Sequence, residues 1–336
     1  MQNHNPKSIL IIGGTGIIGK AMVAEAIGAG YLVTTIGTKK NQVLSKEVTQ
    51  VLVDRKNKQE YSHVLGEINN GVLWDIVLDV LNFGGEDARE TYEIFKNSAK
   101  HIFIMSTTLV YDRSQPSNLI KSSHPLAQKG VLGGYVDQKL ELEKFWSSIT
   151  DHNWTILRPY HILGPGSLLG CLPDHNRDPK LLERIKNNEP LYLCNGGNIA
   201  LNYIHPSDIA HLVLKCAGNP ITYGKAYNAV NPTRIIAKDY FEMIGKVLGK
   251  TVCIVNKPIQ EIWEENKGWQ LTTLPHEYDV SDLKQDIDFI PSVPLEIAIH
   301  EAIGNYPKEQ DIKNISVHER MTLLPRPQPI KWLLDV

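Results

Sequence analysis

A glycine-rich turn near the start of the chain restricts its fold more than any other feature. Glycines stand at positions 13, 16 and 19, between a β-branched run (residues 8–12) and a segment of helical spacing (residues 20–29). One glycine allows a tight turn, another lets the backbone approach a pyrophosphate, and a third lets helix and strand pack closely. This order predicts a dinucleotide-binding turn in which first-turn N–H groups and the helix dipole attract phosphate. The residues expected to contact the cofactor here are Gly13, Thr15, Gly16, Ile17, Ile18 and Gly19.

Short apolar runs alternate with helical segments through the first half of the chain. The expected strands are residues 8–12, 31–36, 48–53, 75–81, 101–105 and 154–157, and the expected helices are residues 20–29, 86–98 and 134–148. Such alternation is typical of βαβ units. The sequence therefore predicts an α/β protein with a Rossmann-type, doubly wound parallel sheet.

Beyond residue 158 the chain becomes richer in Pro, Gly and Asn, although residues 239–249 look helical and residues 251–255 look like a strand. We expect a dinucleotide-binding domain over residues 1–158, to which residues 203–230 return. Residues 159–202 and 231–336 are expected to form a smaller C-terminal α/β substrate-binding region over the open edge of the sheet. The prolines that follow residue 290 predict an irregular end after about residue 308.

Composition excludes several classes of partner. A net charge of −2 gives no broad basic face, so no nucleic acid partner is expected. The four cysteines form no CxxC pair and suit a reducing compartment, and the histidines lack the spacing of metal ligands. The apolar run at residues 9–12 is too short for a signal peptide or a membrane span. We expect a cytoplasmic protein with no metal and no membrane association.

The residues after the second expected strand bear on the choice of dinucleotide. A carboxylate there would bind the ribose 2′-hydroxyl of NAD, but the chain has Thr38, Lys39 and Lys40. A hydroxyl and two cations accommodate a 2′-phosphate, so NADP(H) is favoured over NAD(H), unless the lysines only form a solvated loop. Asp54, just past the third expected strand, either contacts the adenine or caps a surface turn.

Tyr135 and Lys139 stand four residues apart and therefore share one face of the expected helix. An ammonium close to a phenol favours the phenolate, so we expect the pKa of Tyr135 to be lowered. Such a tyrosine can exchange a proton with a carbonyl or hydroxyl oxygen. Thr107 and its neighbours Ser106 and Thr108 directly follow an expected strand, where a hydroxyl would point into the cofactor crevice.

With these motifs the sequence resembles the extended branch of the short-chain dehydrogenase/reductase superfamily, which contains epimerases, dehydratases and reductases. The resemblance implies Tyr135 as general acid/base, Lys139 as its partner and ribose ligand, and Thr107, three residues before Val110-Tyr111, as the second oxygen donor. The third strand's Asp54-Arg55 resembles the NAD-dependent epimerase/dehydratase group and implies a cofactor contact by both residues. The matching segments are ILIIGGTGIIGKAMV (9–23), DIVLDV (75–80), HIFIMSTTLVYD (101–112), YVDQK (135–139), ILRPYHILGPG (156–166), NYIHPSDIAH (202–211) and KAYNAVNP (225–232).

Two positions depart from the nucleotide-sugar enzymes of this branch. Those enzymes usually carry Asn in place of His161 and Arg in place of Leu201, and both hold substrate phosphate. A leucine removes the charge-assisted contact that a diphosphate needs. Thr108 and His161 remain candidates for substrate binding, although a packed, hydrogen-bonded histidine is an equal alternative for His161.

Three functions follow from these features. The first is an NAD(P)-dependent oxidoreductase that transfers hydride at a secondary alcohol or ketone of a polar or sugar-like small molecule. The second is a nucleotide-sugar epimerase or dehydratase that retains NAD. The third is a non-catalytic dinucleotide sensor or RNA-associated scaffold, which the intact Tyr135–Lys139 pair disfavours. The resemblance also allows a homodimer formed through the helix at residues 134–148.

Overall fold

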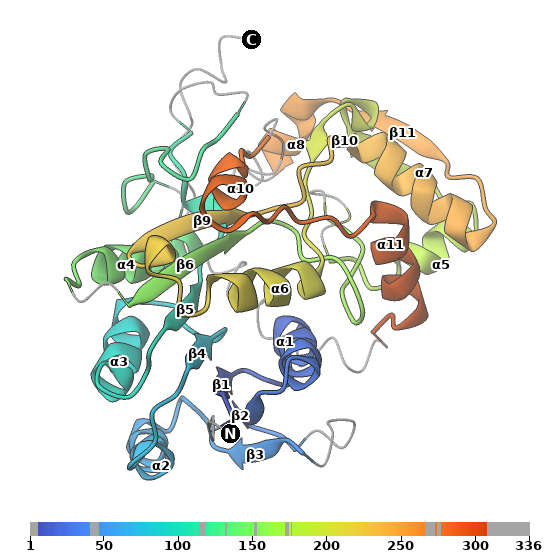
Figure 1. Ribbon diagram of the computed structural model, residues 1–336. Helices are drawn as coiled ribbons and strands as arrows, with labels where there is room; N and C mark the ends of the chain where they lie inside the picture. Colours follow the sequence, from blue (N-terminus) through green and yellow to red (C-terminus); the bar gives the residue numbers. More distant parts are fainter. Residues whose placement is uncertain are drawn as a thin grey trace.

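A parallel sheet runs through the larger part of the computed structural model (Figure 1). The structure describes residues 6–40, 47–113, 119–131, 133–150, 153–171, 175, 177–265, 273 and 277–307. Within these ranges seven strands pair in the order β3-β2-β1-β4-β5-β6-β9, each parallel to its neighbour. The strands are β1 (Ser8–Ile12), β2 (Leu32–Gly37), β3 (Thr49–Leu52), β4 (Ile76–Asp79), β5 (Ile102–Met105), β6 (Trp154–Pro159) and β9 (Lys225–Ala229).

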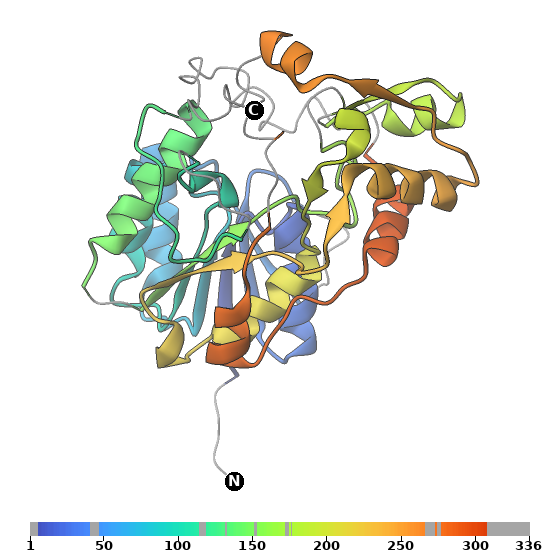
Figure 2. The same ribbon diagram turned by 90° about the horizontal axis from the view of Figure 1, so that it is seen from above.

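Helices cover both faces of this sheet, which explains why its central strands are almost continuous apolar runs. Figures 1 and 2 show α1 (Ile17–Gly28) and α6 (Pro206–Cys216) on one face, where their apolar side chains pack on β1. The opposite face carries α2 (Lys58–Asn69), α3 (Gly85–Phe95) and α4 (Gly134–Ser147), packed on alternate residues of the same strands. The predicted α/β, Rossmann-type fold is therefore confirmed.

A smaller part lies to one side of the sheet and has its own apolar core, formed mainly by α5 (Leu181–Lys186), α7 (Ala237–Leu248) and α11 (Leu295–Gly304) (Figure 2). Two short sheets support it, one parallel and one antiparallel. The parallel pair is β7 (Leu191–Cys194) with β11 (Ile254–Lys257), and the antiparallel pair is β8 (Ala200–Leu201) with β10 (Ile235–Ile236). The remaining elements are α8 (Ile259–Glu265), α10 (Ser281–Ile287), η1 (Thr108–Val110), η3 (Asn195–Gly197) and η4 (Pro220–Thr222).

The structure differs from the sequence-based expectation in a few elements. The strand expected at 251–255 lies at Ile254–Lys257 because Ile254 pairs with Leu191 of β7. No helix is predicted from the sequence at α2, where only Tyr61 and Leu65 are buried and the apolar pattern is correspondingly weak. The irregular end expected after about residue 308 lies outside the described residues. Within the described ranges no helix is long and apolar enough to cross a membrane, and no side-chain cluster could hold a metal ion.

The strand order determines where a ligand can bind. β1 lies between β2 and β4, so the chain winds away from it in both directions, and the crevice beyond the carboxyl ends opens at this switch point. The glycine turn follows β1, Val80 and Leu81 follow β4, and Ser106 and Thr107 follow β5. The tertiary fold thus lines up these three loops along one edge of the sheet.

Candidate active site

The glycine turn has the shape that a pyrophosphate requires. Gly13 has a φ of 95°, and its carbonyl accepts a hydrogen bond of 3.1 Å from the amide of Gly16. No side chain caps the start of α1 at Gly16, so the first-turn N–H groups remain available for an anion. A Cβ at position 19 would lie 2.2 Å from the Gly13 carbonyl oxygen, so only glycine permits this approach of helix and strand. These residues fit a dinucleotide.

The loop after β2 lies beside the glycine turn. A Cβ at Gly37 would be 3.6 Å from Oγ1 of Thr15, and the next residues, Thr38, Lys39 and Lys40, are all exposed. Neither lysine forms an ion pair with a described residue. Asp54 is also exposed, and its Oδ1 accepts a hydrogen bond of 2.9 Å from the amide of Lys56, so it forms the turn cap that was one of its two predicted roles.

Arg55 lies against the end of β4. Its Nη1 donates to both carboxylate oxygens of Asp79, at 3.0 and 2.9 Å, and its Nη2 donates to Thr91 Oγ1 at 2.8 Å. Burial by itself would lower the pKa of Arg55, but the charges of Asp79, Tyr61 and Asp87 and the hydrogen bond to Asp79 together outweigh burial and raise that pKa. Arg55 thus forms a brace that holds the loop after β3 against β4 and α3, and its contact with a cofactor stays a prediction.

The predicted catalytic residues Thr107, Tyr135 and Lys139 come together at the carboxyl end of β5. The Thr107 side chain opposes the rise in the pKa of the Tyr135 phenol, and the Oγ1 atom of Thr107 accepts a hydrogen bond from the amide of Leu109 at 3.3 Å. Ser106 turns away and donates its hydroxyl proton to Glu143. Ser106 is therefore engaged away from the tyrosine, and Thr107 stays the predicted second oxygen donor.

Lys139 is buried, and its ammonium is hydrogen-bonded to backbone carbonyls. Its Nζ donates to the carbonyls of Asn82 at 2.6 Å and Met105 at 2.7 Å, and it lies 4.6 Å from the centre of the Phe83 ring. The distance to the centre of the Tyr135 ring is 6.0 Å. Burial lowers the pKa of Lys139 to about 7, although nearby carboxylates oppose this shift. The lysine connects the ends of β4 and β5 to α4.

The expected lowering of the Tyr135 pKa is wrong for this structure. Burial raises the pKa of the phenol, and the opposing effects come from the charge of Arg177 and the hydrogen bond to Thr107. The physical reason is that Lys139 donates its protons to two backbone carbonyls instead of the phenol. Burial also lowers the pKa of Lys139 itself, so its positive charge does little to stabilise a phenolate. Desolvation therefore dominates at the tyrosine.

A buried ion pair connects α4 to β6. Arg158 of β6 pairs with Glu143 at 2.6 Å, and Ser106 donates to the same carboxylate. The remaining donors of Arg158 reach the hydroxyl of Tyr111 at 2.9 Å and the carbonyl of Ser122 at 2.7 Å. Since every charge in this network is hydrogen-bonded, it can hold the helix that carries Tyr135 and Lys139 in a fixed position.

The two residues predicted to bind substrate differ in their surroundings. Thr108 is fully buried, and its hydroxyl lies 3.5 Å from the carbonyl oxygen of Pro159. His161 has a buried Nε2 without a hydrogen-bond partner, and its ring packs edge-on against Tyr240 at 6.5 Å between centres. Burial, followed by the charge of Arg177, lowers the pKa of His161 to about 4. A packed, hydrogen-bonded histidine is therefore not what the structure has here.

Arg177 is a site residue that the sequence did not reveal. Its charge lowers the pKa values of both Tyr135 and His161, in each case as a smaller effect than burial. In the sequence it is a single arginine in a Pro- and Asn-containing segment, with no motif around it. Only the fold brings it to the tyrosine.

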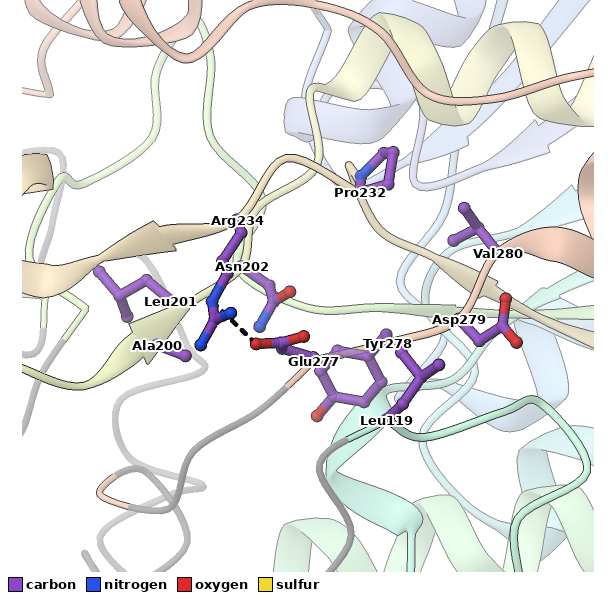
Figure 3. A pocket seen from close by; sticks show the side chains of 10 residues that line it. All are labelled: Leu119, Ala200, Leu201, Asn202, Pro232, Arg234, Glu277, Tyr278, Asp279 and Val280. Atoms are coloured by element: carbon purple, nitrogen blue, oxygen red, sulfur yellow. Dashed lines mark ion pairs between the residues drawn. The ribbon is translucent and has the colours of Figure 1, made fainter.

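A separate pocket of about 220 Å³ lies beside Leu201 (Figure 3). Arg234 and Glu277 face each other in it and form an ion pair of 3.0 Å, and Asp279 adds a second carboxylate. The charged side chains of the lining therefore have one more negative than positive charge. The lining residues are Leu119, Ala200, Leu201, Asn202, Pro232, Arg234, Glu277, Tyr278, Asp279 and Val280.

Comparisons with known proteins agree with this geometry. The model of the NAD dependent epimerase/dehydratase family matches residues 9–229, whereas no protein of curated function matches the sequence. The chain is similar in structure to an NAD complex of UDP-glucuronic acid 4-epimerase from Bacillus cereus, with a TM-score of 0.69 and 15% identity over 92% of this chain and 99% of that one. It is also similar to an NAD complex of dTDP-glucose 4,6-dehydratase from Bacillus anthracis, with a TM-score of 0.68 and 16% identity over 91% and 98%.

A third similar structure is an epimerase from Methanothermobacter thermautotrophicus, with a TM-score of 0.71 and 14% identity over 93% of this chain and 95% of that one. At these identities the solved structures show a shared fold. The family model covers well over half of the chain, from the first strand of the sheet to its last. The chain therefore belongs to the NAD dependent epimerase/dehydratase family, in the extended branch of the short-chain dehydrogenase/reductase superfamily.

Proposed function

We propose that this protein is an NAD(P)-dependent oxidoreductase that acts at a secondary alcohol or ketone of a polar or sugar-like small molecule. The observation that carries the proposal is the position of the Tyr135 ring, whose centre lies 6.0 Å from the buried ammonium of Lys139, at the sheet edge that also holds the glycine turn. A proton donor and a dinucleotide cradle on one edge are what carbonyl reduction needs.

Each part of the cofactor has candidate ligands. Backbone groups from Gly13 to Gly19 would hold the pyrophosphate, Thr38 and Lys39 would hold a 2′-phosphate, and Lys139 would bind the nicotinamide ribose. When bound, the nicotinamide supplies or accepts a hydride at C4. The chain's own groups must then orient the substrate and handle the proton.

Tyr135 is suited to proton donation in the direction of reduction. Its raised pKa keeps the phenol protonated at neutral pH, so it can give its proton to the substrate oxygen. Thr107 then stabilises the phenolate by its hydrogen bond, and the charge of Arg177 acts in the same sense. In the oxidation direction the same phenolate takes the proton back.

The mechanism is tested by a Tyr135→Phe variant, assayed with an alcohol or ketone found by substrate screening. We expect kcat to fall about 10²- to 10⁴-fold, since proton transfer contributes about that factor, while the Kd of the dinucleotide stays unchanged. Tyr192→Phe is the matched control, because that ring is 47% exposed on β7. Normal turnover by Tyr135→Phe would contradict the assignment.

The preference for NADP(H) is tested at Lys39. We expect Lys39→Glu to weaken NADPH binding relative to NADH by about tenfold or more, because a charge-assisted contact to the 2′-phosphate is replaced by repulsion. Lys186→Glu, an exposed lysine at the end of α5, is the control and leaves the ratio unchanged. An unchanged ratio in Lys39→Glu would leave NAD(H) as the proposed cofactor.

A second candidate is an epimerase or dehydratase that retains NAD, supported by the similarity to nucleotide-sugar enzymes with bound NAD. Against it, Leu201 lines a pocket with an excess of negative charge, which repels a diphosphate. Mass spectrometry of the purified protein distinguishes these two candidate functions. Release of one equivalent of NAD on denaturation, with no net consumption of added cofactor, would favour the second candidate.

A further inference from the structure

β4 ends at Asp79, whose carboxylate is fully buried. Its Oδ2 accepts a hydrogen bond from the Thr91 hydroxyl at 2.6 Å and another from Nδ2 of Asn82 at 3.2 Å. Its Oδ1 accepts from the amide of Leu81 at 3.0 Å. Together with the bonds from Arg55, these donors satisfy a charge that would otherwise be costly to bury.

The loop after β4, residues 80–83, is tied to this carboxylate through Asn82. The side chain of Asn82 is fully buried, and its Nδ2 donates to Asp79 and, at 3.3 Å, to Thr91. Its Oδ1 has no hydrogen-bond partner, so among the described residues these two bonds alone fix the side chain. The backbone carbonyl of the same residue accepts the 2.6 Å bond from Nζ of Lys139. The position of the ammonium therefore depends on Asp79 through one intervening residue.

The same loop borders the glycine turn. The amide of Val80 donates to the carbonyl of Ile12 at 3.0 Å, and the Leu81 side chain would lie 2.9 Å from a Cβ at Gly13. The loop that Asp79 holds thus reaches both the turn expected to bind a pyrophosphate and the ammonium of Lys139.

Asp79 also bears on the charge of Lys139. Burial lowers the pKa of this ammonium to about 7, and among the carboxylates that oppose the shift Asp79 has the largest effect. The other titratable or charged groups around the ammonium are Glu143 and Tyr135 on its own helix, Asp87 on α3 and Arg55 after β3. A neutral side chain at position 79 would therefore favour loss of the Lys139 proton.

We propose that Asp79 is a positioning residue of the dinucleotide site: its carboxylate fixes the loop of residues 80–83, and this loop holds the ammonium of Lys139 where a cofactor ribose would meet it. Lys139 enters here as the ribose ligand of the proposed function, on which the inference rests. The route from Asp79 to Lys139 is a pair of hydrogen bonds through Asn82, so a change at Asp79 or Asn82 should alter the ammonium.

The full chain is tested by NMR titration of protein with ¹³C-labelled lysines, in which the Lys139 signal is assigned with a Lys139→Met variant. In Asp79→Asn the pKa of Lys139 should fall by about 1, because a nearby opposite charge shifts a pKa by about 1–3. The Kd of NADPH should rise about tenfold, since its ribose ligand is displaced. A fall in thermal stability alone, with the pKa and the Kd at wild-type values, would make Asp79 merely structural and overturn the proposal.

Asn82→Ala separates the hydrogen-bonded route from the charge, because this variant keeps Asp79 and removes only the link. We expect the pKa of Lys139 to fall less than in Asp79→Asn, while the Kd of NADPH still rises. An unchanged pKa and Kd would show that Asp79 does not act through the loop, and would also overturn the proposal. If circular dichroism shows that Asp79→Asn does not fold, Asn82→Ala carries the test by itself.

Glu93→Gln is the matched control, because it removes one carboxylate from α3 at an exposed position, where Glu93 pairs with Lys96 at 2.6 Å. The pKa of Lys139 and the Kd of NADPH should both keep their wild-type values in it. Equal changes in Glu93→Gln and Asp79→Asn would contradict a specific role of Asp79. The Lys139 titration needs no substrate, so its outcome is independent of the Tyr135→Phe assay that tests the proposed function.

Discussion

Lys139 is buried and Tyr135 is partly buried, and desolvation moves their pKa values in opposite directions, up for the phenol and down for the ammonium. Both shifts favour the neutral pair over the phenolate–ammonium pair. The spacing of four residues correctly indicated one helical face, but proximity on a helix does not make an ion pair when the ammonium is directed elsewhere. The charge that acts on the phenol comes from Arg177.

The depressed pKa of Lys139 predicts a specific pH dependence of stability. Below about pH 7 the lysine is protonated in both the folded and the unfolded state, so its buried charge destabilises the fold in full. As the pH rises from about 7 toward the ordinary value of 10.5, the folded state loses the proton first, and stability is regained. The free energy of unfolding of the wild type should therefore rise in this window relative to Lys139→Met. Urea titrations of both proteins between pH 6 and 10 measure it, and a pH-independent difference would contradict the shift.

At the scale of elements, the contact between α1 and β1 makes the phosphate cradle. α1 contributes its uncapped first turn, and its distance from the strand is limited by Gly19. The brace formed by Arg55 and Asp79 supports the loop on the other side of the glycine turn, since the amide of Leu81, two residues beyond β4, donates to Asp79 and the Leu81 side chain would lie 2.9 Å from a Cβ at Gly13. The cradle therefore depends on two neighbouring strand ends.

Replacing Gly19 should damage the cradle without unfolding the helix. In Gly19→Ala the new methyl group would lie 2.2 Å from the Gly13 carbonyl oxygen, so the turn must shift away from α1. We expect dinucleotide affinity, measured by NADPH fluorescence titration, to fall about tenfold or more. Gly28→Ala in the same helix is the control, because its Cβ meets nothing within 4 Å and alanine favours a helix. Equal affinities in the two variants would exclude the close packing as a determinant.

At the scale of the molecule, the segment that leads into α11 is attached to α6, which packs on the large parallel sheet. The buried carboxylate of Asp208 accepts the amide protons of Ser292 and Val293, at 3.0 to 3.2 Å. Tyr203 and Asn231 both donate to the carbonyl of Val293, at 2.9 and 3.1 Å. These bonds join α11, which belongs to the smaller core, to the larger part of the fold.

We expect Asp208→Ala to release this attachment locally. Two amides would lose their acceptor, which costs about 1–3 kcal/mol for a buried group. Hydrogen exchange should accelerate at residues 290–294, while exchange in β1 and β4 stays slow until global unfolding. Glu242→Ala, an exposed position on α7, is the control and should leave the exchange pattern unchanged. Unchanged protection at 290–294 in Asp208→Ala would show that the segment is held by other contacts.

The sequence by itself determined the features that depend on local pattern. Apolar runs of strand length with glycines after them predicted β1 and its turn, and a four-residue spacing predicted the shared face of Tyr135 and Lys139. These signals are contained in short segments, so they can be identified without knowledge of the distant chain. The family resemblance, confirmed by the match over residues 9–229, depends on the same segments.

The tertiary structure decided which charges meet and which are shielded from water. It placed Arg55 on Asp79 and turned Ser106 toward Glu143, and the charge that lowers the pKa of the Tyr135 phenol comes from Arg177 instead of Lys139. Burial then raised the pKa of Tyr135, contrary to the expectation from spacing. Such outcomes depend on desolvation and on contacts between segments far apart in the chain, and no local pattern encodes either of them.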